Sequence, residues 1–324
     1  MRALRIPAPG TLHLAEVPEP VAGPGEEIYR PHLVGLCGTD LDLIDGLVDP
    51  AFVRYPLTLG HEWVGRDSAG RTVVTEGLIP CGSCVRCEEG RENLCATYAE
   101  LGFTRDGAAA ATLAVPRHLA HEIAAGVDPT AAVIAEPASV VYRALERAIP
   151  TPGARILIIG DGTIGLLAAA LARVWEPERV DLRGLRTEQA TLAEHAGVDR
   201  FLTRRAAKGY DLVVEASGSP AGVAAALAAT RRGGTLALLG YLGRDVRFPL
   251  DVDALINADL TVLGSFASTS ASWRSVVELI NAGTLDAGWL VTHRFALTDY
   301  VAAVDALRHP HGARGKIVLE LPQN

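Results

Sequence analysis

The segment Ala154–Trp175, ARILIIGDGTIGLLAAALARVW, decides the fold. An uninterrupted apolar run ends in glycine and a strongly helical stretch follows at once, which predicts a buried strand joined to a helix by a tight turn. The turn GDGTIG matches G-x-G-x-x-G, whose glycines permit the turn, the close approach of a pyrophosphate and the packing of helix on strand. We therefore expect dinucleotide binding here. The predicted cofactor-binding residues of this turn are Gly160, Gly162, Thr163, Ile164 and Gly165.

The same alternation continues on both sides of this segment. Upstream, EPASVVYRALERAIP has helical spacing and stops at proline; downstream, apolar runs such as YDLVVEASG and GGTLALLGYLG alternate with helical stretches such as AGVAAALAAT. Strands that alternate with helices indicate a doubly wound parallel sheet. The first third, up to about Glu136, is instead rich in Pro and Gly with short apolar runs, which predicts an irregular, mainly β domain with long loops.

The identity of the dinucleotide depends on the residue that ends the second strand, where an acid would accept a hydrogen bond from the ribose 2′-OH of NAD. Asp181 stands at about the generic distance of roughly 20 residues, although it comes early in VDLRGLRTEQ. Counting back from a helix expected to begin with Thr187 as N-cap leaves Gly184, Leu185 and Arg186 at that place. Glycine leaves room for a 2′-phosphate and Arg186 can neutralise it, so we favour NADP over NAD. A solvated loop charge is the alternative for Arg186.

Composition excludes several classes of partner. The 324 residues, 49% of them hydrophobic, are ample for two globular domains. The formal net charge of −8 disfavours nucleic acid and anionic membranes as partners. No apolar run approaches the roughly 20 residues that span a bilayer, and MRALRIPAPG lacks the apolar core of a signal peptide. We expect a cytoplasmic protein.

Four of the five cysteines form the cluster CGSCVRCEEGRENLC, with the spacing C-x2-C-x2-C-x7-C. Four thiolates that converge in this way are typical of a closed, tetrahedral structural zinc site, which ties down a loop and does no chemistry. Free cysteines or an iron–sulfur cluster are the alternatives. The predicted ligands are Cys81, Cys84, Cys87 and Cys95.

Cys37 stands alone in VGLCGTDLDLIDG. An isolated cysteine is often a small buried hydrophobic residue. However, LGHEWVG offers His61 beside Glu62, and IAEPASV offers Glu136. A thiolate, an imidazole and a carboxylate would give a three-ligand zinc site with one open position, the arrangement of catalytic zinc. Spacing alone does not decide between these readings.

These motifs together resemble a known family. GLCGTD, GHEWVG, the four-cysteine lobe, AEP, GDGTIG, EASG and the closing THRF and GKIVLEL occur in the order found in zinc-dependent medium-chain alcohol dehydrogenases. The resemblance covers nearly the whole chain. It implies a discontinuous GroES-like catalytic domain, residues 1–136 and 268–324, and a Rossmann domain, residues 137–267. Relatives are homodimers or homotetramers.

The resemblance also implies roles for single residues. Cys37, His61 and Glu136 would hold the catalytic zinc, and Glu62 would be a nearby carboxylate that approaches the metal or lies behind its ligands. Thr39 would take the proton of the substrate hydroxyl. Gly184, Leu185 and Arg186 fall where NADP-dependent relatives carry Gly-x-Arg. Lys316 falls where relatives place a basic residue near the pyrophosphate, with a surface lysine as the alternative.

One departure concerns the proton relay. Many relatives have a histidine five residues after the zinc cysteine, and this chain has Asp42, so that the relay would run through a carboxylate or directly to water. The carboxylates beside the metal, together with ELGFTRDGA and THRFALTDY, resemble the polyol and aminocyclitol branch. The expected reaction is reversible oxidation of a secondary alcohol to a ketone by hydride transfer to the nicotinamide, with zinc polarising the oxygen.

Three other functions remain open at this point. An aldose 1-dehydrogenase is the nearest alternative. A zinc-free quinone or enone reductase of the same superfamily would lack both metal sites, and a non-catalytic binding protein could retain the fold. Zinc analysis separates the classes: two ions per chain indicate the dehydrogenase, one a binding protein, and none the reductase.

Overall fold

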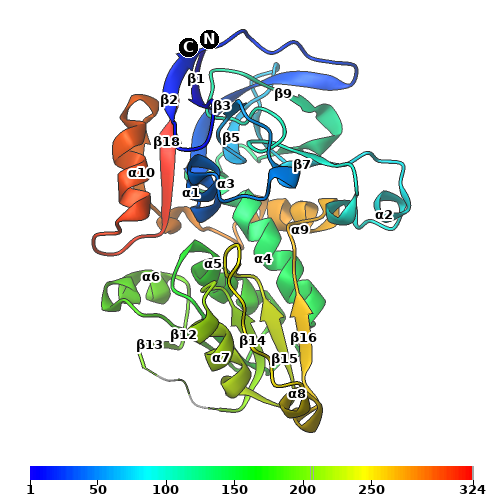
Figure 1. Cartoon of the computed structure of the whole chain (residues 1–324), viewed down its shortest axis with the longest axis vertical. Helices are drawn as coiled ribbons and strands as arrows, with labels where there is room; N and C mark the ends of the chain where they lie inside the picture. The colour runs from blue at the N-terminus through cyan, green and yellow to red at the C-terminus, as the bar shows by residue number, and fades with distance from the viewer. Residues whose placement is uncertain (205, 207, 323–324) are drawn as a thin grey trace. The chain divides into compact units, whose positions relative to one another are not determined.

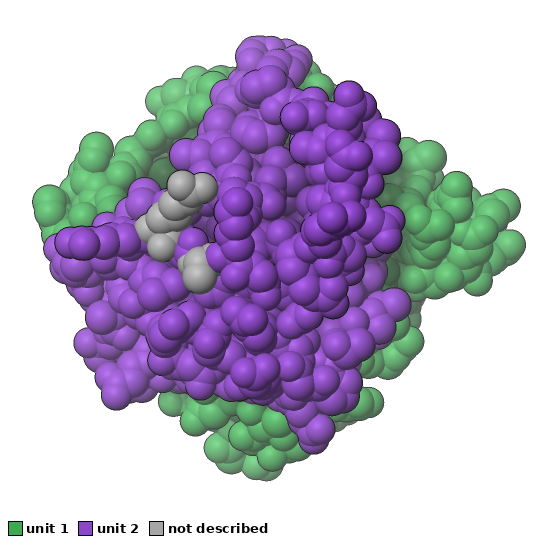
Figure 2. All heavy atoms as spheres, turned by 90° about the horizontal axis from the view of Figure 1, so that it is seen from below, with its two compact units in different colours: residues 1–136, 268–311, 316–324 green, residues 137–267, 312–315 purple. Residues whose placement is uncertain are grey.

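The computed structural model describes residues 1–204, 206 and 208–322, and divides them into two compact units (Figure 2). Unit 1 comprises residues 1–136, 268–311 and 316 onward, and unit 2 comprises residues 137–267 and 312–315. The short segment Gly312–Gly315 therefore departs from the expected boundary. Its reason is local, because the buried Gln189 of unit 2 exchanges hydrogen bonds with the backbone of Arg314.

Unit 2 is built on a six-stranded parallel sheet with the order β13-β12-β11-β14-β15-β16 (Figure 1). The doubly wound sheet predicted from the sequence is confirmed. The central strands are continuous apolar runs because both faces are buried, and Ile156, Leu157 and Ile158 have no exposed surface. The strands are β11 (Arg155–Ile159), β12 (Arg179–Arg183), β13 (Arg200–Leu202), β14 (Tyr210–Glu215), β15 (Thr230–Leu238) and β16 (Thr261–Gly264).

The helices of unit 2 follow the predicted alternation. The glycine-rich turn lies between β11 and α5, and the strand order reverses between β11 and β14, where doubly wound sheets bind ligands at their carboxyl edge. The expected N-cap at Thr187 is wrong: this residue begins a 3-10 turn whose N-cap is Arg186, without a side-chain cap bond. The α-helices are α4 (Ala135–Ala148), which begins with the last residues of the first part of unit 1, α5 (Thr163–Ala172), α6 (Ala190–His195), α7 (Pro220–Ala229) and α8 (Val252–Ala258).

Unit 1 is mainly β, as its Pro- and Gly-rich sequence predicts. Its largest sheet has the order β10-β6-β5-β3-β18-β17, with β9 also paired to β3; the smaller sheets are β2-β1-β4 and β7-β8. The strands are β1 (Arg2–Ile6), β2 (His13–Glu16), β3 (Glu26–Leu36), β4 (Leu57–Thr58), β5 (Glu62–Arg66), β6 (Thr72–Thr75), β7 (Leu78–Ile79), β8 (Ala99–Glu100), β9 (Leu113–Pro116), β10 (Ala120–Glu122), β17 (Val291–Ala296) and β18 (Lys316–Glu320).

The last strand of the chain, β18, lies inside this sheet between β17 and β3, and β3 pairs on its other side with β5. This arrangement brings the C-terminal strand close to residues near the start of the chain. A core that includes Leu36, Trp63 and Ile317 fixes the three strands. The α-helices of unit 1 are α1 (Gly38–Asp45), α2 (Val85–Glu88), α3 (Pro129–Ala132), α9 (Ser270–Asn281) and α10 (Tyr300–Arg308).

Among the described residues, none of the helices combines the length and apolar character that a membrane crossing requires.

Candidate active site and cofactor site

Cys37, His61 and Glu62 lie together in unit 1, with one ligand atom of each within 4.8 Å of the others. The Cys37 Sγ is 3.3 Å from Nε2 of His61, and that nitrogen is 3.9 Å from Oε1 of Glu62. His61 and Glu62 are buried and Cys37 is half-buried. A thiolate, an imidazole nitrogen and a carboxylate are ligands that Zn²⁺ prefers, and three of them leave a coordination position open.

Local structure explains the position of the cysteine. Cys37 directly follows the long strand β3 and is the N-cap of α1, and its backbone N–H donates a 2.8 Å hydrogen bond to the Asp40 carboxylate. The other oxygen of Asp40 lies 3.4 Å from Nδ1 of His61. Asp40 is 1% exposed, so a single buried carboxylate orients both the cysteine and the histidine.

The sequence pattern does not single out Asp40, which lies inside GLCGTD. A usable signal was its place three residues after the N-cap, where an acidic side chain can bond back to the N-cap backbone. Burial by itself lowers the pKa of His61, but Cys37 and Asp40 outweigh it and raise that pKa well above its usual value. Such a surplus of negative charge calls for a cation, which fits a divalent metal ion.

Glu62 is held by an ion pair with Lys316. The Lys316 Nζ lies 2.5 Å from one carboxylate oxygen and 2.7 Å from the other, and also donates to the Leu36 carbonyl. Gly35 pairs with Glu62 across β3 and β5, and any side chain there would collide with the carboxylate. The ion pair therefore depends on a strand position without a side chain.

This pair corrects both readings of Lys316. The lysine is 2% exposed, so it is not a surface residue. It is also not offered to a pyrophosphate, because its ammonium group is already bound by Glu62 and Leu36 inside unit 1. Burial disfavours its charge, but Glu62, Cys37 and Glu136 raise the pKa of Lys316 above its ordinary value. The sequence could not predict this contact, which spans 254 positions.

Two further carboxylates lie near the cluster without joining it. Burial and the Glu62 carboxylate raise the pKa of Glu136 to about 7, while His61 and Lys316 oppose the shift. Burial also raises the pKa of Glu100 to about 7, against the effect of His61. Glu136, the expected third zinc ligand, is outside the group whose ligand atoms lie within 4.8 Å, and Glu62 takes that place here. Glu100 did not stand out in the sequence.

Thr39 and Asp42 lie on α1, three residues apart, and so on the same side of the helix. Thr39 is half-buried and Asp42 is exposed. Partial burial and the neighbouring Asp45 raise the pKa of Asp42 above its ordinary value. Asp45 is tied instead to Arg308 of α10 by two hydrogen bonds.

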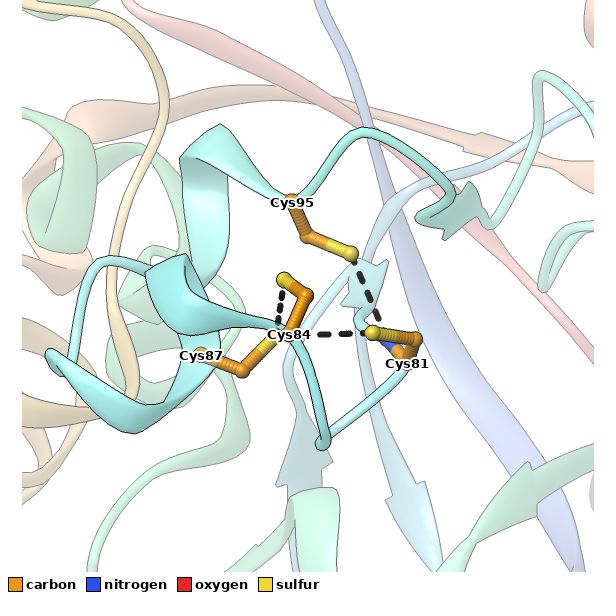
Figure 3. Close-up of side chains that lie close together, drawn as sticks. All are labelled: Cys81, Cys84, Cys87 and Cys95. Atoms are coloured by element: carbon orange, nitrogen blue, oxygen red, sulfur yellow. Dashed lines mark hydrogen bonds between the residues drawn. The ribbon is translucent and has the colours of Figure 1, made fainter.

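The four clustered cysteines converge in space as their spacing predicts (Figure 3). The Sγ atoms of Cys84 and Cys87 are 3.5 Å apart, and those of Cys81 and Cys87 are 3.9 Å apart. Backbone N–H donors, chiefly that of Ser83, lower the pKa of Cys81 to about 5, whereas burial raises the pKa of Cys87 to about 12. Four sulfurs this close cannot all ionise without a cation, so the set fits a tetrahedral zinc ion.

The glycine-rich turn of unit 2 has the geometry that its motif predicts. Gly160 has φ +118°, and a Cβ there would lie 2.7 Å from the backbone of Ala216. A Cβ at Gly165 would collide with the Gly160 carbonyl, so this glycine lets α5 pack closely on the turn. Gly162 is the N-cap of α5, which starts with Thr163 and Ile164, and as a glycine it offers no side chain to cap that helix end. Backbone N–H groups at such a helix start suit a pyrophosphate.

The structure separates the two candidates for the adenosine ribose. Asp181 lies inside β12, has no exposed surface, and accepts hydrogen bonds from Arg200 and Tyr210. It is a structural residue and cannot face a ribose. Gly184, Leu185 and Arg186 follow β12 directly, one residue after its end at Arg183. The Gly-Leu-Arg turn therefore stands where the acid of NAD-binding proteins would be.

Comparison with known proteins agrees with this geometry. Residues 23–125 match the alcohol dehydrogenase GroES-like domain and residues 163–282 match the zinc-binding dehydrogenase family. The chain is 35% identical to an L-threonine 3-dehydrogenase of Streptomyces avermitilis, covering 95% of this chain and 96% of the relative. It is 29% identical to a sorbitol dehydrogenase of Halalkalibacterium halodurans, with the same coverage.

Among solved structures, a zinc-binding dehydrogenase from Sinorhizobium meliloti bound to NADP has a TM-score of 0.91 and 28% identity, covering 98% of both chains. The GroES-like and Rossmann domains expected from the resemblance are thereby confirmed. Two donor sets for zinc, one of four cysteines and one of a cysteine, a histidine and a glutamate, are present in one chain with a dinucleotide-binding sheet. The chain therefore belongs to the zinc-binding medium-chain dehydrogenases, enzymes that act on a CH–OH group with NAD(P).

Proposed function

We propose that this enzyme reversibly oxidises a secondary alcohol that carries a polar group on the neighbouring carbon, as a polyol or aminocyclitol does, to a ketone, with NADP preferred over NAD. The observation that carries the proposal is the buried group of Cys37, His61 and Glu62, held by Asp40 and Lys316. Unit 1 acts as the catalytic domain and unit 2 as the cofactor domain.

The catalytic zinc is assigned to Cys37 and His61 together with a carboxylate. Two carboxylates are candidates for that place. Glu62 has a ligand atom within 4.8 Å of those of Cys37 and His61. Glu136 lies close enough to Glu62 for that carboxylate to raise the pKa of Glu136. The bound metal supplies a Lewis acid for the substrate oxygen. Lys316 neutralises Glu62 when that carboxylate is not on the metal. The second zinc is assigned to Cys81, Cys84, Cys87 and Cys95.

Thr39 accepts the hydroxyl proton of the substrate, and Asp42 passes it to water. Their shared side of α1 supports this order, because the half-buried threonine and the exposed aspartate lead from the metal ligand Cys37 toward solvent. A carboxylate with a raised pKa is better suited to exchange protons near neutral pH than an ordinary aspartate.

The substrate class rests on polarity. Glu100 and Glu136 are half-buried carboxylates near the metal ligands, and either can accept a hydrogen bond from a hydroxyl or ammonium group. L-threonine and sorbitol, the substrates in the names of the two relatives, share a secondary alcohol beside a carbon that bears nitrogen or oxygen. L-threonine itself is the second candidate because of the 35% identity. An aldose oxidised at C1 is the third.

The NADP preference rests on the Gly184-Leu185-Arg186 turn. No acidic side chain ends β12, and Arg186 is half-buried at the turn. The similar dehydrogenase bound to NADP supports the same choice.

Edge strand β16 and nearby apolar side chains, among them the 69% exposed Ile256 of α8, support assembly into a homodimer or homotetramer.

A panel assay tests the proposal. Polyols, cyclitols, aldoses, L-threonine and simple secondary alcohols are offered with NADP and with NAD, and nicotinamide absorbance is followed. Turnover of a polyol or aminocyclitol above all others supports the lead; the highest kcat/KM on L-threonine replaces it with the second candidate.

Arg186→Ala should weaken NADPH binding about tenfold or more and leave NADH binding nearly unchanged, because it removes one charge-assisted contact to the 2′-phosphate. Equal losses would contradict the role of Arg186.

A further inference from the structure

Asp161, the second residue of GDGTIG, reaches across to the turn that follows β12. Its Oδ2 accepts hydrogen bonds from the backbone N–H groups of Leu185 and Arg186, at 2.9 and 3.1 Å, and its Oδ1 lies 3.3 Å from the Arg186 guanidinium. The Asp161 side chain is 13% exposed. One carboxylate of the glycine-rich turn therefore binds both the backbone and the side chain of the proposed NADP determinant.

Asp161 also explains why no acid stands at Gly184. A Cβ at Gly184 would lie 2.6 Å from the Cβ of Asp161, so no side chain fits there while Asp161 keeps its place. In NAD-binding sheets an acid after the second strand faces the ribose. Here β12 is followed by Gly184, and Asp161 of the glycine-rich turn places a carboxylate beside the same turn.

A second arginine lies beside this carboxylate. Arg314 belongs to the short segment that joins unit 2, and the buried Gln189 fixes it through hydrogen bonds of 2.8 and 2.9 Å with its backbone. Burial and the Arg186 charge lower the pKa of Arg314, and Asp161 opposes them, so the three charges are close neighbours. Nη1 of Arg186 is buried and has no hydrogen-bond partner among the residues that the structure describes. The cluster has two cations and one anion, and it keeps donor capacity for a further anion.

We propose that Asp161 determines the cofactor specificity of the adenosine-ribose subsite: it positions Arg186 and, by its charge, restrains the affinity for a 2′-phosphate, so that the enzyme uses both NADP and NAD. This inference rests on the proposed cofactor role of unit 2. Arg186 and Arg314 attract the phosphate of NADP. Asp161 repels it and, through its remaining lone pair on Oδ1, accepts a hydrogen bond from the free 2′-OH of NAD.

The charge balance gives the direction of the effect. A 2′-phosphate carries about two negative charges near neutral pH, and it would bind beside a carboxylate that already occupies two backbone donors. Replacement of Asp161 by asparagine keeps the shape and an acceptor oxygen but removes the charge. Repulsion of NADP then falls, while the contact with the ribose of NAD weakens.

The test measures dissociation constants of NADPH and NADH by nicotinamide fluorescence for the holoenzyme and its variants. The unaltered enzyme should bind the two within about tenfold of each other. Asp161→Asn should raise the preference for NADPH about tenfold, which corresponds to ~1.4 kcal/mol. Competition by 2′,5′-ADP should strengthen in the same variant, and competition by 5′-AMP should not, because only the former carries the phosphate.

Asp211→Asn is the matched control. Asp211 has the same kind of environment, with the backbone N–H of Arg155 and the Arg231 guanidinium as its hydrogen-bond donors. However, it lies near the amino end of β14, whereas the glycine-rich turn follows the carboxyl end of β11. It should leave the ratio of the two dissociation constants unchanged. If Asp161→Asn does not fold, Asp161→Ser serves, since serine also bonds to backbone and carries no charge.

Two results would overturn the inference: an unaltered enzyme that prefers one cofactor more than a hundredfold, or an Asp161→Asn variant whose ratio equals that of the parent. The proposed function fails separately. Failure of the unaltered enzyme to bind either dinucleotide counts against the cofactor role of unit 2. An Arg186→Ala variant with an unchanged ratio counts against the NADP assignment and against the positioning of Arg186 by Asp161, whereas Asp161→Asn tests the effect of the Asp161 charge.

Discussion

The two donor sets for zinc are built in opposite ways. Cys81, Cys84, Cys87 and Cys95 lie on one lobe, at most 14 positions apart, and Cys81 is exposed. Cys37, His61 and Glu62 come from a helix N-terminus, a turn and a strand, and are packed against the central strands β3, β5 and β18. The first set has four identical ligands that are close in sequence and leave no coordination position open. The second set has three different ligands that the fold brings together, and it leaves one coordination position open.

Charge shows the same contrast. The four-cysteine lobe has no cation among its ligands; the backbone N–H of Ser83 chiefly lowers the pKa of Cys81, and burial chiefly raises the pKa of Cys87. The mixed set is already balanced in part, because Lys316 neutralises Glu62 and Asp40 stabilises a protonated His61. The lobe should therefore depend on its metal for structure, and the mixed set should depend on its metal only for chemistry.

The largest expected effect is loss of activity in Cys37→Ser. Serine removes the only sulfur ligand of the mixed set, so kcat should fall about a thousandfold or more. Elemental analysis should give one zinc per chain in place of two, with an unfolding temperature close to that of the parent. Retained turnover at one zinc would show that the mixed set is not the catalytic centre.

Cys84→Ser is the reciprocal experiment. It should remove the other zinc and lower the free energy of unfolding by about 3 kcal/mol or more, because metal binding contributes directly to folding of the lobe. Activity per folded molecule should persist at temperatures where unit 1 is intact. Thermal unfolding followed with zinc release checks this order, and a Cys84→Ser variant as stable as Cys37→Ser would remove the distinction between the two sets.

A smaller effect is expected for Asp40→Asn. The amide still accepts the hydrogen bond from the Cys37 N–H, but it no longer favours a proton on Nδ1 of His61. Groups that orient metal ligands typically alter affinity or activity about 10- to 100-fold, so kcat/KM should fall by that factor. The zinc content distinguishes weaker binding from altered chemistry. Asp45→Asn, on the same helix but bound to Arg308, should leave kcat/KM within about threefold.

Sequence pattern predicted the features that are local. The alternation of apolar runs and helices identified the parallel sheet, and cysteine spacing identified the lobe, because each depends on neighbours along the chain. Contacts between distant parts of the sequence were not predictable. The Lys316–Glu62 pair joins residues 254 positions apart. Asp181 has the spacing of a ribose ligand, but only the structure shows that it is buried inside its strand. Asp40 and Asp161 escaped prediction for the same reason. Each is an acid inside a known motif, and each contacts a residue far away in the sequence, His61 for Asp40 and Arg186 for Asp161.

The smallest effect should come from Asp42→Asn, which tests whether protons pass from the mixed set to solvent through Asp42 on α1. In the parent, Asp42 must be ionised to accept the proton from the relay, so alcohol oxidation should decline as pH falls through its pKa. Partial burial and Asp45 raise this pKa above its ordinary value. The asparagine variant should lose this limb and retain oxidation within about tenfold, because water can take the proton directly. Asp45→Asn removes the repulsive neighbour, lowers the pKa of Asp42, and should move the same limb to lower pH. A pH profile that is identical in all three proteins would make Asp42 a surface residue without a part in proton transfer, and Thr39 would then deliver its proton by a route that does not include Asp42.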